Sequence, residues 1–166
     1  MTFRDLFLSK MGLGQNPSGG PNVLHTATYC LELPRGWRVE ETGKVAVIRG
    51  PRGELFQVSS ASSLVGDASG MSQSIEVLRK TAKQSINSLL AEPDLKLLEG
   101  PAKKTTPLGF SYEEVLLRAP SGDLVAGFVV HGPRTSVIAT LDAAPDQRSV
   151  DEVRQSIHST SFDGAV

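Results

Sequence analysis

Alternation of apolar and polar residues dominates the chain from residue 23 onward and predicts short β-strands. In residues 27–33, Tyr29, Leu31 and Leu33 share one face, while Thr28 and Glu32 point to the other. Similar runs predict further strands at residues 37–39, 44–49, 54–61, 95–99, 110–118, 123–131 and 135–142. Gly- and Pro-containing turns separate these runs, and the last three strands are expected to form a β-meander.

Two segments have helical spacing instead. Apolar residues recur every three or four positions at Ile75, Leu78, Ala82, Ile86, Leu89 and Leu90. This spacing predicts one long helix, which Ser72 or Ser74 can cap and Pro93 limits. A second, shorter helix is expected to start at Ser149, with Glu152 completing a capping box. Its buried face is predicted to hold Val153 and Ile157.

The order of strands, helix, strands and helix predicts an α+β fold, in which a curved antiparallel sheet is flanked by one long and one short helix. The sequence contains no βαβ alternation and no internal repeat. We expect one continuous core, with contributions from Tyr29, Leu31, Trp37, Phe56, Ile75, Leu78, Ile86, Phe128, Val130, Ile138, Val153, Ile157 and Phe162.

The chain divides into residues 1–22 and an α+β domain at 23–166. Within the first part, a short amphipathic helix is predicted at residues 2–11, followed by a Gly/Pro-rich linker. One stripe of this helix carries the candidate partner-binding residues, which are Phe3, Leu6, Phe7 and Met11. Three roles stay open for the stripe: covering an open edge or face of the sheet, binding a partner or a second copy, or touching a membrane surface.

Composition excludes several classes of function. The chain has 17 Lys and Arg residues against 18 Asp and Glu residues, which disfavours a nucleic-acid partner. A single cysteine, Cys30, rules out an intrachain disulfide and a cysteine-based zinc site. Neither a signal peptide nor a stretch long enough to span a membrane is evident, so a cytoplasmic location is expected.

No residue pattern predicts a catalytic site, a metal site or a cofactor. His25, His131 and His158 lack the spacing of a helical zinc site, and no Gly-x-Ser-x-Gly motif is present. Glu113 and Glu114 are neighbours on a predicted strand, so their side chains should point to opposite faces. One is expected to be solvated and the other to lie near a rim.

Other conspicuous residues receive structural interpretations. Lys103 and Lys104 are expected to be isolated cations on a turn. Trp37 is expected to be a core aromatic beside a turn rather than a residue that stacks on a ligand. Cys30 is expected to be an inert, partly buried thiol.

The segment LELPRGWRV at residues 31–39, followed by hairpin strands, a long helix, a meander and a short helix closing on STSF, resembles the PsbP-like fold. That group includes PsbP, DcrB, LpqN and accessory proteins of type VI secretion effectors. The resemblance covers residues 23–162 and implies a non-enzymatic module that binds another protein. It assigns no site residues, because the shared motif is a turn.

The leading hypothesis is therefore a bacterial, cytoplasmic protein-binding or accessory module, with a chaperone-like adaptor for a secreted partner as its narrower form. The alternative is a small-molecule-binding or hydrolytic domain that uses the concave face of the sheet. An open apolar surface would favour a protein partner. A closed pocket with converging polar groups would favour a ligand.

Overall fold

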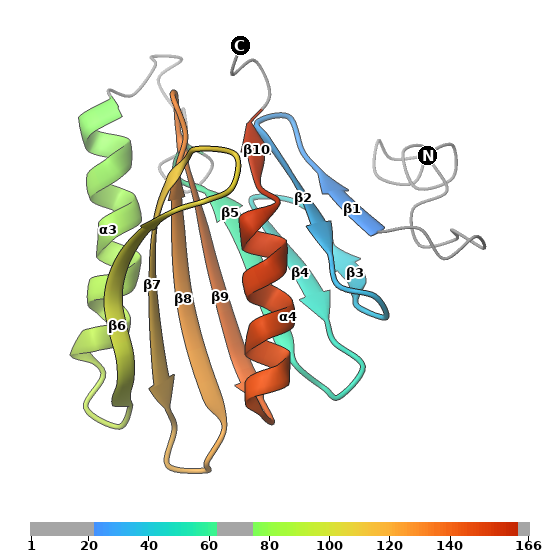
Figure 1. Cartoon of the computed structure of the whole chain (residues 1–166), viewed down its shortest axis with the longest axis vertical. Coiled ribbons are helices and arrows are strands. Elements are labelled where there is room, and N and C mark those ends of the chain that lie inside the picture. Colours follow the sequence, from blue (N-terminus) through green and yellow to red (C-terminus); the bar gives the residue numbers. More distant parts are fainter. Residues whose placement is uncertain (1–21, 63–74, 163–166) are drawn as a thin grey trace.

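The computed structural model describes residues 22–62 and 75–162, which form one strongly curved sheet, a small second sheet and two helices (Figure 1). The large sheet has the strand order β3-β4-β5-β9-β8-β7-β6, and every neighbouring pair is antiparallel. Its strands are β3 (Arg38–Glu41), β4 (Val45–Arg49), β5 (Leu55–Ser60), β6 (Lys96–Thr105), β7 (Ser111–Arg118), β8 (Leu124–His131) and β9 (Ser136–Ala144). The small sheet has the order β1-β2-β10, from β1 (Asn22–His25), β2 (Tyr29–Leu33) and β10 (Ser161–Phe162). This is the antiparallel α+β architecture that the sequence predicts.

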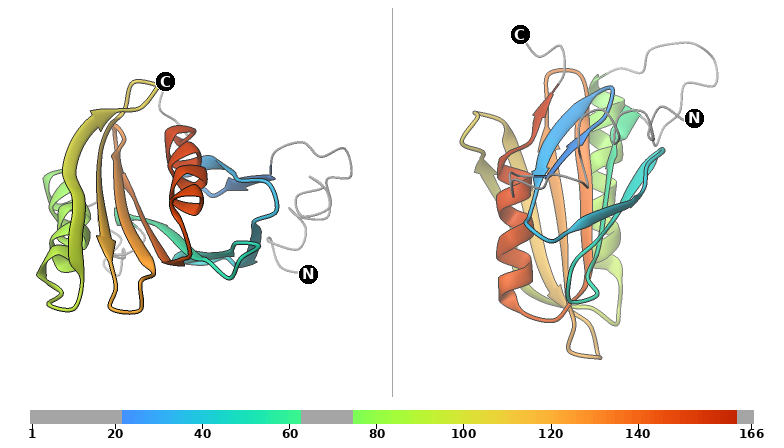
Figure 2. Two further views of the ribbon diagram at one scale, coloured as in Figure 1. Left: turned by 60° about the horizontal axis from the view of Figure 1, so that its bottom comes forward. Right: turned by 90° about the vertical axis from the view of Figure 1, so that its right-hand side faces the viewer.

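The two faces of the large sheet are covered differently (Figure 2). Helix α4 (Gln147–His158) and the small sheet lie inside the curve, on the concave face. Helix α3 (Ile75–Ala91) lies outside the curve and covers the half of the convex face that β7, β8 and part of β9 form. Neither α3 nor α4 lies over the convex face of β4 and β5.

This arrangement divides the interior into two cores, so the expected single continuous core is wrong. The concave core contains Tyr29, Leu31, Trp37, Phe56, Phe128, Val130, Val153, Ile157 and Phe162. The convex core contains Leu78, Ala82, Ile86 and Ile138. The sheet separates the cores because side chains alternate between its faces. The side chain of Ile75 lies outside the described residues.

The predicted apolar stripe of the long helix is confirmed for most of its length. Leu78, Ala82 and Ile86 are buried against the sheet, and Leu89 packs against the same cluster. Leu90 is 37% exposed, because it lies to the side of the buried stripe.

The start of the last helix differs from the prediction. Asp146 caps α4, and its carboxylate accepts hydrogen bonds from the amide and the hydroxyl of Ser149, at 3.1 and 3.2 Å. The capping box expected at Ser149 and Glu152 is therefore wrong by one turn. Asp is as good an N-cap as Ser, and here it lies two residues after the end of β9. Glu152 is left to bind other elements.

Strands β6 and β1 were not expected in their observed form, and β10 was not expected. Residues 96–105 form a single strand, although the sequence predicts a strand followed by an irregular passage. Register shifts around Gly100 let β6 continue, because the extra residues bulge out of the ladder with β7. Strand β1 pairs with β2 from Asn22 to His25, and four residues are too few to show alternation.

Candidate functional site

The predicted partner-binding residues Phe3, Leu6, Phe7 and Met11 lie outside the described residues. The site is therefore sought in residues 22–62 and 75–162. In this part of the chain, His, Cys, Asp and Glu side chains form no group of three that could hold a metal ion. None of its helices is long and apolar enough to cross a membrane.

A serine, a histidine and a glutamate meet at one end of β7, β8 and β9. The Nδ1 atom of His131 lies 2.8 Å from the hydroxyl of Ser136, and its Nε2 atom lies 3.7 Å from a carboxylate oxygen of Glu113. Lys83 of α3 binds the other oxygen of Glu113 at 3.1 Å. The sequence does not reveal this group, because strand pairing alone brings residues 113, 131 and 136 together.

The composition of this group is that of a Ser-His-acid triad, but its geometry is not. Ser136 is 1% exposed, so its hydroxyl is closed to a substrate carbonyl. The distance between His131 and Glu113 exceeds that of a hydrogen bond. Burial lowers the pKa of His131, despite the nearby Glu113 carboxylate. The group links α3 to β7, β8 and β9 through polar contacts.

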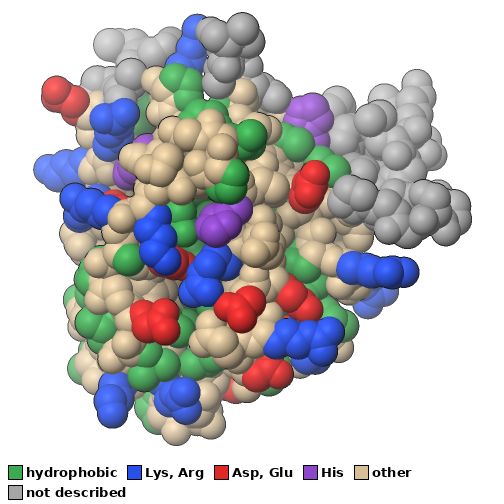
Figure 3. Space-filling view, viewed as in Figure 1, with side chains coloured by type: hydrophobic (Ala, Val, Ile, Leu, Met, Phe, Trp, Pro, Cys, Tyr) green, Lys and Arg blue, Asp and Glu red, His purple; other side chains and the backbone are tan. Residues whose placement is uncertain are grey.

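A second buried carboxylate lies on the concave side of the same strand. Glu114 accepts a hydrogen bond from Lys104 of β6 at 2.7 Å and from Arg154 of α4 at 2.9 Å. Burial acts to raise the pKa of Glu114, but these two cations outweigh it and hold that pKa below its usual value. Beside them, the hydroxyl of Tyr112 lies 2.9 Å from Nε2 of His158. Figure 3 shows basic and histidine side chains gathered over β6 and α4 on this face.

The environment of the two glutamates corrects two expectations. Glu113 and Glu114 do point to opposite faces, as alternation predicts, but neither is solvated, since they are 6% and 8% exposed. Lys104 is a paired cation within β6, not an isolated cation on a turn. A cleft beside Glu114 and Arg154 holds about 40 Å³, which is room for a water molecule and too little for an organic substrate.

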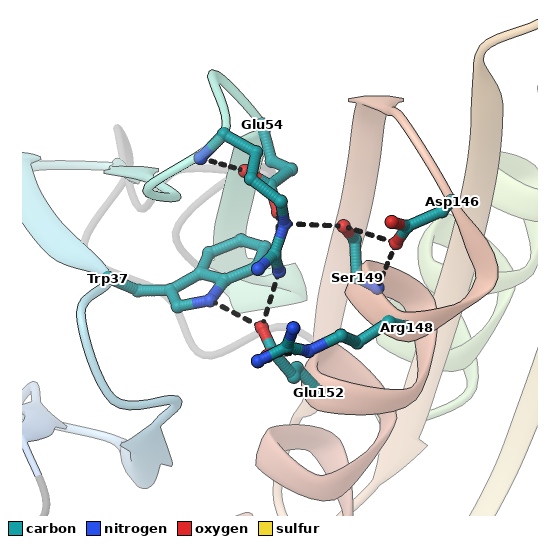
Figure 4. A network of polar contacts seen from close by, with 7 residues as sticks. Trp37, Glu54, Asp146, Arg148, Ser149 and Glu152 are labelled. Carbon is teal, nitrogen blue, oxygen red and sulfur yellow. Dashed lines mark hydrogen bonds and ion pairs between the residues drawn. The ribbon is translucent and has the colours of Figure 1, made fainter.

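A third polar group joins the start of α4 to the β4–β5 hairpin (Figure 4). Glu152 accepts hydrogen bonds from the indole nitrogen of Trp37 at 2.9 Å and from Arg52 at 2.8 Å. Arg52 also contacts the fully buried Glu54 at 3.0 Å. Trp37 itself is fully buried and packs edge-on against Phe56 with 6.2 Å between ring centroids. The expectation that Trp37 is a core aromatic is confirmed.

The Pro-Arg-Gly-Trp turn at residues 34–37 therefore has a structural role. We call the hydrogen bond from Trp37 to Glu152 the Trp37 clamp. Trp37 leads into β3, and its indole fixes that edge of the sheet to α4. Burial acts to raise the pKa of Glu54, but backbone amides, Ser149 and the charge of Arg52 reverse that effect and lower its pKa. The sequence shows the turn but not the clamp, because Trp37 and Glu152 are 115 positions apart.

The remaining candidate is an open groove on the convex face, about 190 Å³ in volume. We define the convex patch as the groove-lining side chains of Val45, Gln57, Ile138 and Thr140, together with Val47, which lies opposite Gln57 on the same face. All five residues are uncharged. Most of them are half-buried, and Ile138 forms the floor at 6% exposure.

Helix α3 presents its uncharged flank to the convex patch. Lys83 reaches Glu113 on β7, which directs the charged flank of α3, with Arg79 and Lys83, away from β5. At 100° per residue, Thr81 and Ser85 fall on the opposite flank, beside the patch. The flank of α3 on the β9 side is therefore uncharged at Thr81 and Ser85.

Comparison with known proteins bears on the fold. No protein-family model matches the chain, and no curated protein matches it in sequence. Among solved structures, the cyanobacterial PsbP, CyanoP, from Synechocystis is similar with a TM-score of 0.52, 14% identity, and coverage of 87% of this chain and 93% of CyanoP. The chain has a PsbP-like fold.

Two further structures are similar at lower scores. LpqN of Mycobacterium tuberculosis, described as involved in cell envelope biogenesis, matches with a TM-score of 0.48, 17% identity, and coverage of 89% of this chain and 86% of LpqN. A Bacteroides thetaiotaomicron protein matches with a TM-score of 0.44, 11% identity, and coverage of 81% of this chain and 44% of its own. At such identities, the PsbP-like assignment concerns the fold.

Proposed function

We propose that this PsbP-like chain is a non-enzymatic, protein-binding accessory module whose partner docks on the convex patch. The observation that carries the proposal is the open, uncharged groove over β4, β5 and β9. Exposed apolar surface of this kind is a feature of protein docking sites. Val45, Val47 and Ile138 supply the apolar contacts, and Gln57 and Thr140, which are paired across β5 and β9, offer hydrogen bonds.

The alternative of a ligand site on the concave face has less support. That face is filled by α4 and the small sheet, whose apolar side chains join it in one core. On the other face of the sheet, the buried hydroxyl of Ser136 argues against hydrolysis there. The small volume of the cleft beside Glu114 argues against an organic ligand.

The shape of the convex patch suggests its partner. An open, partly apolar groove over three strands suits an amphipathic helix laid with its apolar face inward. We therefore propose a chaperone-like adaptor that shields such a helix in a secreted partner. We place this activity in the cytoplasm, in agreement with the balanced charge and the single cysteine.

Capture from the native host with matched surface variants tests this proposal. Val45→Asp puts a charge into the convex patch, and Leu108→Asp puts the same charge on a turn remote from it, where Leu108 is 58% exposed. We expect the wild-type chain and Leu108→Asp to retain the same partner and Val45→Asp to lose it. A folded Val45→Asp chain that retains every partner of the wild type would refute the proposed surface.

A further inference from the structure

We infer that the convex patch is covered in the free protein by the N-terminal apolar stripe of the same chain, Phe3, Leu6, Phe7 and Met11, which a partner helix must displace. This inference rests on the docking role proposed for the patch. The N-terminal segment would then compete with the partner helix for the convex patch, and the stripe would have a defined surface on which to pack. Three observations support it: where the chain enters the sheet, how far the linker reaches, and the match in chemistry.

The chain enters the described structure beside the edge of the large sheet. Asn22, the first described residue, donates its side-chain amide to the carbonyl of Trp37 at 3.2 Å. Trp37 directly precedes β3, the outermost strand on that side. The residues before Asn22 therefore start next to the edge around which a segment must pass to reach the convex face.

The linker is long enough for this passage. Residues 12–21 could span about 33–36 Å if fully extended. The convex patch starts on β4, directly beside β3, and continues onto β5, so it lies about 5–10 Å in from the edge strand. The tether also gives the segment an effective concentration in the millimolar range, which favours it over the same segment of a second copy.

The chemistry of the two surfaces matches. The spacing of the stripe predicts a helix with four large apolar side chains on one side. The residues of the convex patch, Val45, Val47, Gln57, Ile138 and Thr140, are uncharged, and Glu41 borders them opposite Val47 on β3. A short amphipathic helix is marginal alone and is stabilised by packing on such a face.

Methyl NMR on the full chain tests this contact. We compare the wild type with Phe3→Ser/Phe7→Ser, which removes half of the stripe, and with Leu8→Ser, which alters a neighbouring apolar residue off the stripe. We expect the double variant to shift the methyl resonances of Val45, Val47 and Ile138 and to leave those of Leu97 and Leu98 on β6 unchanged. Leu8→Ser should leave all five unchanged. The double variant should also bind the captured partner several-fold more tightly.

Two results would overturn the inference. One is that the methyl resonances of Val45, Val47 and Ile138 have the same positions in the double variant as in the wild type. The other is that the difference in methyl resonances between the wild type and the double variant disappears when the protein is diluted. That result would show that the stripe contacts the patch of a second copy. Failure of the proposed function is recognised separately, because it appears as unchanged partner capture by Val45→Asp whatever the methyl spectra show.

Discussion

The concave and convex faces of the curved sheet are formed by the same strands but differ in how they are covered. On the concave face, α4 and the small sheet cover the strands and bring in Leu31, Ile157 and Phe162, all nearly or fully buried. On the convex face, α3 covers one half, and Val45, Val47 and Gln57 of β4 and β5 stay partly exposed. The concave face is thus closed by packing, whereas part of the convex face stays open.

Adjacent residues show the same contrast at close range. Glu113 and Glu114 have opposite orientations, and each is nearly buried. Glu114 holds two cations from β6 and α4, at 2.7 and 2.9 Å. Glu113 holds one cation from α3 at 3.1 Å and lies 3.7 Å from His131. The buried glutamate on the concave side therefore makes more ion-pair contacts with neighbouring elements than the one on the convex side.

The largest effect is expected at the Trp37 clamp. Trp37→Ala should lower the free energy of unfolding by about 3–5 kcal/mol, because it leaves a large cavity beside Phe56. It also removes the indole donor to Glu152. Trp37→Phe keeps an aromatic ring and should cost clearly less. Denaturant unfolding measures both, and equal losses for the two variants would show that packing in the concave core is not decisive.

A smaller effect separates the two glutamates. Glu114→Gln should lower the free energy of unfolding by about 2 kcal/mol, because it weakens two charge-assisted hydrogen bonds within a buried site. Glu113→Gln should cost about half as much, since its one lysine partner is half-exposed. The pair is matched in sequence position and chemistry. A larger loss at Glu113 would reverse the comparison between the faces.

The dependence of stability on pH should show two stages. Burial lowers the pKa of His131 and His158 in the folded chain, so protons bind the unfolded chain more readily as the pH falls below 6.5. Stability should therefore begin to fall there. The double variant His131→Asn/His158→Asn should lack this first fall in stability. If the fall below pH 6.5 persists in that variant, other groups cause it.

The second stage belongs to the buried carboxylates. The pKa values of Glu54 and Glu114 are lowered in the folded chain, so their stabilisation is complete above 4.5 and is lost as the pH falls through their folded values. Glu114→Gln should reduce the steepness of this acid stage. Chemical unfolding at a series of pH values measures both stages, and an unchanged acid stage in Glu114→Gln would contradict this assignment.

Sequence patterns predict the elements better than the contacts between them. Alternation identifies β7, β8 and β9 and the fold class, and helical spacing identifies the buried face of α3, because these signals are local. The division into two cores depends on which face each helix covers, which spacing alone does not state. The clamp from Trp37 to Glu152 and the group at Ser136 depend on contacts across distant strands and helices. The convex patch is missed for a related reason, since half-exposed valines on β4 look like ordinary strand residues.

Two neighbouring residues of β4 provide the most direct test that the convex face binds and the concave face stabilises. Val47 belongs to the convex patch, whereas Ile48 is fully buried in the concave core. Unfolding free energy and retention of the captured partner are measured together for Val47→Asp and Ile48→Val. We predict that Val47→Asp loses the partner and at most about 1 kcal/mol of stability. Ile48→Val should lose about 0.5–1.5 kcal/mol and keep the partner. Retention of the partner by Val47→Asp, or its loss in a folded Ile48→Val chain, would contradict the division of roles between the two faces.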